Sequence, residues 1–361
     1  MSSSETPQIL LTGAFGYIGG TILSYLISSD SPVLSASTIT CLVRGPDRAA
    51  KLTETYGSRV RIILYKDLDD VEAATAAAAQ HDLVINTTNG FHTPSAVALI
   101  KGLAQRKAST GRDVWYIQTS GTSNLSDRPV TGLWKEPEGR EFDDVKDDVY
   151  GYEKSREEND HKYFQRTTEL TVVDTSLEYG VKTVVIMSGL IFGRGKGLFN
   201  KDSIQIPDVV RAALKRKRTA VPGHGKGVWD HVHVEDLAEL YVLLARQIVE
   251  KGGEGVPTGK KGIIFSGNGR HAWEEVAQRV ADAAYAEGAI AQKEVEHLEL
   301  SEAAKIFLGG QGGEEFVELA LASNSRTVAS VAKNLGWKPT RGEEAWKATF
   351  KEAVKAELEK L

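Results

Sequence analysis

Two side chains at helical spacing near the middle of the chain could carry out proton transfer. Tyr150 and Lys154 lie four residues apart in the run Tyr150-Gly-Tyr-Glu-Lys154, so on a helix they share one face, one turn apart. A neighbouring ammonium group favours the phenolate and lowers the pKa of a tyrosine, which lets its hydroxyl exchange a proton near neutral pH. Tyr152 has Arg156 at the same spacing and is the alternative if the helix register differs.

A hydroxyl that could act with this tyrosine lies in the run Thr119-Ser-Gly-Thr122, at the end of a predicted strand. In a parallel sheet wound with helices, the carboxyl ends of the strands line the ligand crevice. Ser120 could therefore hydrogen-bond a substrate oxygen while Tyr150 exchanges the proton. The register over this strand end leaves Thr122 as the alternative, and we prefer Ser120.

A glycine-rich run near the N-terminus, Thr12-Gly-Ala-Phe-Gly-Tyr-Ile-Gly19, follows an apolar stretch and opens a helical pattern. Gly13 allows a tight turn, Gly16 lets the backbone approach a pyrophosphate, and Gly19 permits close packing of helix on strand. The free N–H groups at the helix N-terminus favour phosphate. The run predicts a dinucleotide site, with a turn that merely connects two elements as the alternative. The expected contacts from this run are Gly13, Phe15, Gly16, Tyr17 and Ile18.

The end of the second predicted strand indicates which dinucleotide is bound. An NAD site usually has an acidic residue there for the ribose 2′-hydroxyl, whereas an NADP site favours arginine. The run here is Cys41-Leu-Val-Arg44-Gly-Pro-Asp-Arg48, so Arg44 and Arg48 could hold the 2′-phosphate through paired N–H donors. We predict NADP, with NAD the less favoured cofactor and two solvated arginines as the alternative. Asp67 is expected to bind the adenine amino group, and Thr87 is a further expected cofactor contact.

Short apolar runs alternate with helical patterns through the first half of the chain, which predicts an α/β fold with a doubly wound parallel sheet (Rossmann). The change of rhythm after Met187 predicts a smaller, discontinuous C-terminal substrate-binding region. We place the dinucleotide-binding domain at 1–187 with 231–262 and the substrate-binding region at 188–230 with 263–361. The expected strands are 8–12, 39–43, 60–64, 83–86, 114–119 and 183–187, and the expected helices are 17–28, 46–56, 70–80, 94–108 and 148–179.

Composition excludes several classes of protein. The 361 residues carry a net charge of −5 with no basic domain, so we expect no nucleic-acid partner. The single cysteine, Cys41, excludes an internal disulfide and a multi-thiolate zinc site. His231 and His233 lack a third ligand at sensible spacing, and we expect them to be structural and the protein to bind no metal. No apolar run reaches the length of a membrane span, so we expect a cytoplasmic monomer or homodimer that acts on a small molecule.

Together these motifs resemble the extended short-chain dehydrogenase/reductases, a group that contains nucleotide-sugar epimerases and dehydratases and dihydroflavonol-type reductases. The matching segments occur in the expected order, at 12–19, 119–122, 150–154, 229–236 and 335–339. The resemblance implies that Tyr150 is the catalytic acid/base. It also implies that Lys154 lowers the pKa of that tyrosine and holds the nicotinamide ribose, and that Ser120 polarises the substrate.

Two segments differ from the sugar-nucleotide enzymes of that group. Met187-Ser-Gly-Leu-Ile-Phe-Gly193 lacks an Arg-Pro pair, and Thr87-Thr-Asn-Gly-Phe-His92 lacks the usual run of small residues. We therefore favour an NADP-dependent oxidoreductase acting on a carbonyl or alcohol of a small organic substrate. The alternatives are an epimerase or dehydratase that retains its dinucleotide, and an NADP-sensing regulator without chemistry.

Overall fold

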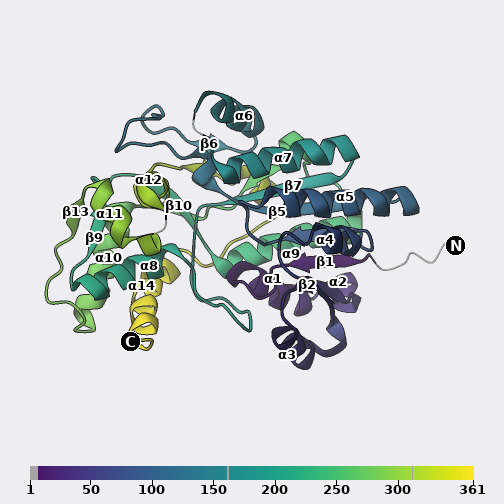
Figure 1. Ribbon diagram of the computed structural model, residues 1–361, viewed down its shortest axis with the longest axis horizontal. Coiled ribbons are helices and arrows are strands. Elements are labelled where there is room, and N and C mark those ends of the chain that lie inside the picture. The colour runs from purple at the N-terminus through teal and green to yellow at the C-terminus, as the bar shows by residue number, and fades with distance from the viewer. Residues whose placement is uncertain (1–6, 161, 311) are drawn as a thin grey trace.

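A seven-stranded parallel sheet forms the centre of the larger part of the molecule (Figure 1). The computed structural model describes residues 7–160, 162–310 and 312–361. The strand order is β11-β7-β5-β4-β1-β2-β3, so the order reverses between β1 and β4. The strands are β1 (Ile9–Thr12), β2 (Ile39–Val43), β3 (Val60–Leu64), β4 (Leu83–Asn86), β5 (Trp115–Gly121), β7 (Lys182–Ser188) and β11 (Ile263–Phe265).

Helices cover both faces of this sheet, which explains why β1, β2 and β4 are buried along their whole length. On one face α1 (Tyr17–Ile27) packs against α9 (Val234–Lys251), and on the other α5 (Thr93–Thr110) packs against α4 (Val71–Ala78) and α7 (Phe164–Tyr179). α2 (Pro32–Ala36) and α3 (Pro46–Tyr56) lie in the crossovers beside β2 and β3. The predicted doubly wound fold is confirmed.

The helix expected over 148–179 is two helices. α6 covers Val149–Asn159, and α7 begins only at Phe164. The chain leaves the helical conformation at Asp160, which has extended backbone angles and takes an ion pair from Arg156 at 2.7 Å. Asn and Asp favour helix ends over helix interiors, which accounts for the break. α6 lies on the outside of α7, away from the sheet (Figure 1).

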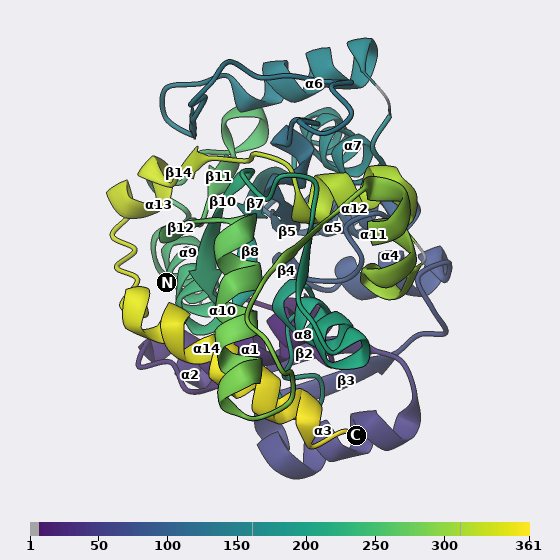
Figure 2. The same ribbon diagram turned by 90° about the vertical axis from the view of Figure 1, so that its left-hand side faces the viewer.

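A smaller three-stranded sheet carries the second part of the molecule. β8 (Leu190–Phe192), β10 (Val228–His233) and β12 (Gly269–Ala272) form it, and α8 (Gln205–Arg216), α10 (Trp273–Ala286) and α14 (Glu343–Leu358) pack beside it (Figure 2). The remaining elements are β6 (Phe142–Asp143), β9 (Ala220–Pro222), β13 (Glu296–Leu298), β14 (Thr327–Val328), α11 (Leu300–Ile306), α12 (Gly313–Leu321) and α13 (Ser330–Asn334).

His231 belongs to the core of this second part, where its ring stacks on Trp346 with 3.9 Å between centroids. Its Nδ1 lies 3.1 Å from Nδ1 of His271. Burial lowers the pKa of His231 to about 3, so the ring is neutral at physiological pH. Among the described residues, no group of three or more His, Cys, Asp or Glu is placed to hold a metal ion.

The predicted boundary at residue 262 falls inside the main sheet. β11 pairs with β7 through Ile263 and its neighbours, so the sheet continues past that position. The segment from Ala329 to Trp337 also returns to the main core, where Trp337 Nε1 donates to the carbonyl of Asp236 at 2.8 Å. The rest of the two-part division stays a prediction. None of the described helices combines the length and apolarity that a bilayer crossing needs.

Candidate functional site

The glycine turn after β1 forms one wall of a cleft at the point where the strand order reverses. Gly13 has a φ of 75°, and a Cβ built there would lie 2.5 Å from Oγ1 of Thr87. Thr87, after β4, donates through that oxygen to the carbonyl of Thr12 at 2.7 Å. A Cβ at Gly19 would lie 2.3 Å from the carbonyl of Gly13. The turn therefore packs backbone on backbone, as a dinucleotide-binding turn must.

The same turn leaves room for a phosphate group. Gly16 precedes α1 without a side-chain cap on the first N–H groups of the helix. A Cβ at Gly16 would meet only the carbonyl of Gly13 within 4 Å, at 3.2 Å. The cleft in front of it has a volume of about 330 Å³. Free helix N–H groups facing such a cleft suit the pyrophosphate of a dinucleotide.

Arg44 and Arg48 are the charged residues among the described lining of this cleft, and no carboxylate lies with them. Arg44 follows β2, and Arg48 lies in the first turn of α3. The Arg48 guanidinium stands over the ring of Phe15, 5.0 Å from its centroid. The cleft is thus cationic where the ribose of an adenine dinucleotide would lie.

Three expected contacts have side chains placed elsewhere. Asp67 is absent from the described lining of the cleft, where its neighbour Leu68 is present. The hydroxyl of Tyr17 donates to the carbonyl of Gly193 at 2.7 Å and fastens the segment after β8. Ile18 lines the neighbouring cavity instead. Gly13, Phe15, Gly16, Arg44, Arg48 and Thr87 line the cleft together.

A second cavity adjoins the cleft and shares Thr87 and Thr88 with it. It lies at the carboxyl ends of β5 and β7 and has a volume of about 330 Å³, within the range of ligand pockets. None of its described lining residues is charged. Apolar side chains in its lining include Phe91, Ile191, Ile204, Trp229, Leu308 and Phe316. Polar groups in its lining come from Thr119, Ser120, Thr122, Ser123, Tyr163 and Gln165.

Both candidate strand-end hydroxyls line this second cavity, and their environments differ. Ser120 donates to Oε2 of Glu169 on α7, and Asn124 Nδ2 donates to the same oxygen at 2.8 Å. Thr122 Oγ1 is buried without a hydrogen-bond partner among the described residues. Of these two candidates, Ser120 is the one that contacts a carboxyl group.

Tyr150 and Lys154 are not among the described residues that line the cavity of Ser120, so the structure does not bring the three predicted catalytic residues together there. Their helical spacing brings Lys154 Nζ to 3.5 Å from the Tyr150 hydroxyl as predicted. However, the hydroxyl donates to Oδ1 of Asp174 at 2.5 Å, and neither residue is among the described lining of either cavity. Asp174 lies ten residues past the start of α7 at Phe164, about 15 Å along the helix. The cause is the separation of α6 from α7, which leaves both residues on the outer helix.

The electrostatics of Tyr150 also oppose the predicted role. Burial, and then the hydrogen bond to Asp174, raise the pKa of Tyr150 to about 12. Lys154 is exposed on α6 and is absent from the described lining of both cavities. Tyr152, the alternative, donates to Oε1 of Glu136 at 2.5 Å and takes a bond from Arg156 Nη1 at 2.9 Å. These tyrosines fasten α6 to its surroundings.

Tyr163 is the tyrosine that lines the cavity, and the sequence reasoning missed it. It precedes α7, and its hydroxyl donates to Oγ of Ser123 at 3.1 Å. Ser123 Oγ in turn donates to Oε1 of Gln165 at 2.7 Å. Burial raises the pKa of Tyr163 to about 12. Thr167 stands four residues later, where the search for a tyrosine–cation pair requires a lysine or arginine, so no local signal marked this tyrosine.

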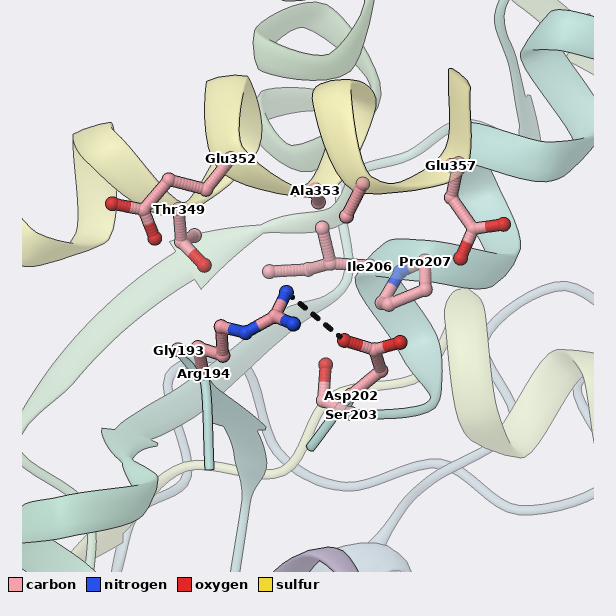
Figure 3. Close-up of a pocket in the computed structure, with 11 residues that line it drawn as sticks. Gly193, Arg194, Asp202, Ser203, Ile206, Pro207, Thr349, Glu352, Ala353 and Glu357 are labelled. Atoms are coloured by element: carbon pink, nitrogen blue, oxygen red, sulfur yellow. Dashed lines mark ion pairs between the residues drawn. The ribbon is translucent and has the colours of Figure 1, made fainter. Parts of the chain in front are cut away.

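A third cavity, between α8 and α14, is too small for a substrate (Figure 3). Its volume is about 40 Å³, close to the room that one water needs. Arg194 and Asp202 face each other across it at 3.9 Å. The two adjoining cavities at the strand ends remain the candidate site.

Comparisons with known proteins show the family of this chain. The family model of the NAD dependent epimerase/dehydratase family matches residues 138–256. The oxidase ucsJ of Acremonium sp is 32% identical over 343 residues, which covers 92% of this chain and 93% of that protein. The chain belongs to the NAD-dependent epimerase/dehydratase family. Its members are the extended short-chain dehydrogenase/reductases, so the predicted resemblance is confirmed.

Solved structures of this family share the fold. A double mutant of the dTDP-glucose 4,6-dehydratase DesIV from Streptomyces venezuelae, with NAD bound, is 14% identical with a TM-score of 0.64 over 96% of both chains. A UDP-N-acetylglucosamine 4-epimerase from Methanobrevibacter ruminantium is 15% identical with a TM-score of 0.59 over 98% of this chain and 99% of that one. At these identities the likeness shows the Rossmann-type architecture alone.

Proposed function

We propose that this member of the family is an NADP-dependent oxidoreductase. It exchanges a hydride between the nicotinamide and a carbonyl or alcohol carbon of a small, largely apolar substrate. The observation that carries the proposal is the charge of the two cavities. Arg44 and Arg48 supply cations where the 2′-phosphate would bind, and the described lining of the substrate cavity has no charge.

The uncharged cavity separates this reaction from sugar-nucleotide chemistry. A nucleotide-sugar substrate brings its own pyrophosphate, which needs arginine or lysine side chains or helix N-termini. No cation lies among the described residues that line the substrate cavity. Aromatic and aliphatic walls such as those of Phe91, Trp229 and Phe316 instead suit an apolar body with one polar group.

Each group of residues in the site has its own role in the proposed reaction. The turn at Gly13 and Gly16 would hold the pyrophosphate, and Arg44 and Arg48 the 2′-phosphate. Bound NADPH would supply the hydride. Thr87 lines both cavities, so it would lie where the reacting ends of cofactor and substrate meet. The hydroxyl groups in the cavity lining then bind the substrate oxygen.

Cofactor titration tests the first half of the proposal. NADPH and NADH are titrated into the wild type, Arg44→Ala, Arg48→Ala and Lys51→Ala. Lys51 is an exposed cation on α3 outside the described lining of the cleft. Its variant therefore measures the effect of removing one nearby positive charge that does not contact the cofactor. Each arginine variant should lose NADPH affinity worth about 1.5–3 kcal/mol and keep its NADH affinity. Tighter binding of NADH by the wild type would contradict the proposal.

A substrate screen tests the second half. NADPH oxidation is followed at about 340 nm (a property of the cofactor) with a panel of apolar aldehydes and ketones and a matched panel of nucleotide sugars. We expect turnover in the first panel only. Purification with stoichiometric, unexchangeable dinucleotide would favour an epimerase or dehydratase cycle. Tight NADPH binding without turnover in either panel would favour a sensor.

A further inference from the structure

Ser120 is the point at which the substrate cavity meets a buried pair of carboxyl groups. It lines the cavity, and its hydroxyl donates to Oε2 of Glu169. Asn124 Nδ2 donates to both members of this contact, to Ser120 Oγ at 3.4 Å and to Glu169 Oε2 at 2.8 Å. The Ser120 hydroxyl therefore stands between the position of a substrate oxygen and a titratable group.

Glu153 on α6 completes the pair. Its side chain is 0% exposed, and neither of its carboxylate oxygens meets a donor in hydrogen-bond geometry among the described residues. The carboxyl of Glu169 lies within hydrogen-bonding reach of it. Two ionised carboxylates offer acceptors only and cannot bond each other. A proton held by one of the two side chains would remove their mutual repulsion and let them bond each other.

The nearby arginines are themselves paired with other carboxylates. Arg166 Nε pairs with Glu157 Oε2 at 3.1 Å, and Arg156 Nη2 pairs with Asp160 Oδ2 at 2.7 Å. Arg166 also lowers the pKa of Glu153, but by less than burial and the repulsion from Glu169 raise it. Burial, together with the repulsion between the two carboxylates, raises the pKa of Glu153 well above its ordinary value, and burial raises that of Glu169.

We propose that the Glu153–Glu169 pair is the proton reservoir of this site and that Ser120 relays its proton to and from the substrate oxygen. The proposal rests on the proposed function, because the relay has a role only where a carbonyl is reduced or an alcohol oxidised. In this proposal the proton comes from Glu153 on α6 and Glu169 on α7, through Ser120. Tyr150 and Lys154 on α6 take no part in the transfer.

The transfers balance in both directions. In reduction bound NADPH would supply a hydride to the carbonyl carbon, and the carbonyl oxygen would take the proton of the Ser120 hydroxyl. Ser120 Oγ regains a proton from Glu169. The pair passes from a diacid to a monoanion that shares its remaining proton, and Ser120 and Asn124 donate to the carboxylate that forms. Solvent restores the second proton between turnovers, and alcohol oxidation runs the same transfers in reverse.

Tyr163 is the competing proton donor in the cavity. Its hydroxyl leads to Ser123 and then to the amide oxygen of Gln165, and an amide holds no exchangeable acid proton at that oxygen. The chain from Tyr163 therefore ends without a titratable group, whereas the chain from Ser120 ends in two. This difference makes Tyr163→Phe the decisive comparison with Glu169→Gln.

Infrared difference spectroscopy tests the reservoir in the protein without cofactor or substrate. A buried carboxylic acid has a C=O stretching band distinct from the carboxylate bands. That band should be present at low pH in the wild type, decrease as the pH rises through neutrality, and change in Glu153→Gln and Glu169→Gln. Asp174→Asn, which replaces an exposed carboxylate on the same helix, is the matched control and should leave it unaltered. A band missing from the wild type, or unchanged in both glutamine variants, would overturn the proposal.

Kinetics test the relay. Glu169→Gln and Ser120→Ala should each lower kcat/KM by about 10²-fold or more while NADPH affinity stays at the wild-type value. Glu169→Gln should also remove the neutral ionisation from the pH profile, which a merely structural role would not do. A Glu169→Gln variant with the wild-type pH profile, or a larger loss in Tyr163→Phe, refutes the relay. If the wild type reduces no carbonyl, the proposed function fails, and the infrared titration still decides whether the reservoir exists.

Discussion

The Tyr150 hydroxyl and the carboxylate of Asp174 are joined by a hydrogen bond of 2.5 Å that ties α6 to the second half of α7. The first turn of α7 lies at the other end of that helix, where Tyr163 contacts Ser123 at the strand end. The ring of Tyr150 also lies 4.8 Å from Lys260 Nζ, in the segment before β11. Tyr150 is therefore held at the end of α7 that is remote from the substrate cavity.

Tyr150→Phe should therefore leave turnover close to the wild-type value. The substitution keeps the buried ring and removes one hydrogen bond to a carboxylate, so it should lower the free energy of unfolding by about 1–2 kcal/mol. Urea unfolding measures that loss, and steady-state kinetics with NADPH measures turnover. A fall of 10²-fold or more in kcat/KM, with the fold intact, would return the proton transfer to Tyr150.

Arg44→Asp should reverse the cofactor preference. The aspartate would repel a 2′-phosphate and accept a hydrogen bond from a free ribose 2′-hydroxyl, as the acid at this position does in NAD sites. Loss of a charge-assisted contact changes affinity by roughly 10- to 100-fold, so the ratio of the NADPH and NADH dissociation constants should move at least that far. Isothermal titration measures both constants. Lys51→Asp makes the same charge change nearby and should shift the ratio little; an equal shift would mean that Arg44 makes no specific contact.

Gly13→Ala should weaken both folding and cofactor binding. Its Cβ would lie 2.5 Å from Thr87 Oγ1 and 2.8 Å from the Thr87 carbonyl, at a φ of 75°. Left-handed strain and overpacking together cost about 2–5 kcal/mol. Gly111→Ala is the control, because its φ is 69° but no atom lies within 4 Å of a Cβ there. Thermal unfolding should show a clearly smaller loss for Gly111→Ala, and equal losses would show that the contact with Thr87 is not tight.

The sequence predicted well what local signals specify. The six expected strands of the sheet are all present, because each is a short run rich in β-branched and aliphatic residues. The glycine turn and Arg44 line one cleft because they follow neighbouring strands, β1 and β2, whose carboxyl ends share one edge. Ser120 reached the cavity for the same reason, at the end of β5. The place of β11 beside β7 depends on tertiary packing that no local signal specifies.

The tyrosine could not be chosen from the sequence, for a physical reason. Spacing of four residues shows that Tyr150 and Lys154 share a helix face, and they do meet. It does not show what that face packs against. The packing of that face depends on the helix break at Asp160, because the break makes α7 rather than α6 the helix that reaches the strand end. Glu153 and Glu169 come together only because α6 then folds back on α7, and no spacing in the sequence predicts that contact.

His81 should make the protein sensitive to mild acid. It is fully buried, its Nδ1 lies 2.6 Å from the carbonyl of Ala77, and its Nε2 lies 3.2 Å from Arg61 Nη2. The neutral ring with its proton on Nδ1 fits both partners, since Arg61 can only donate. Burial lowers the pKa of His81 to about 4, whereas an unfolded histidine titrates near about 6.5.

The unfolded state therefore binds this proton first, so the contribution of His81 to stability is fully present above about pH 6.5 and is lost as the pH falls toward 4. The loss should reach about 2 kcal/mol at about pH 5. His81→Asn keeps a donor toward Ala77 and removes the titration, so its unfolding free energy should fall less than that of the wild type between neutral pH and that pH. His224→Asn, at an exposed histidine, should follow the wild-type curve. If urea unfolding gives parallel curves for the wild type and His81→Asn, the His81 ring already carries its second proton in the folded protein, and the contact with Arg61 does not hold it neutral.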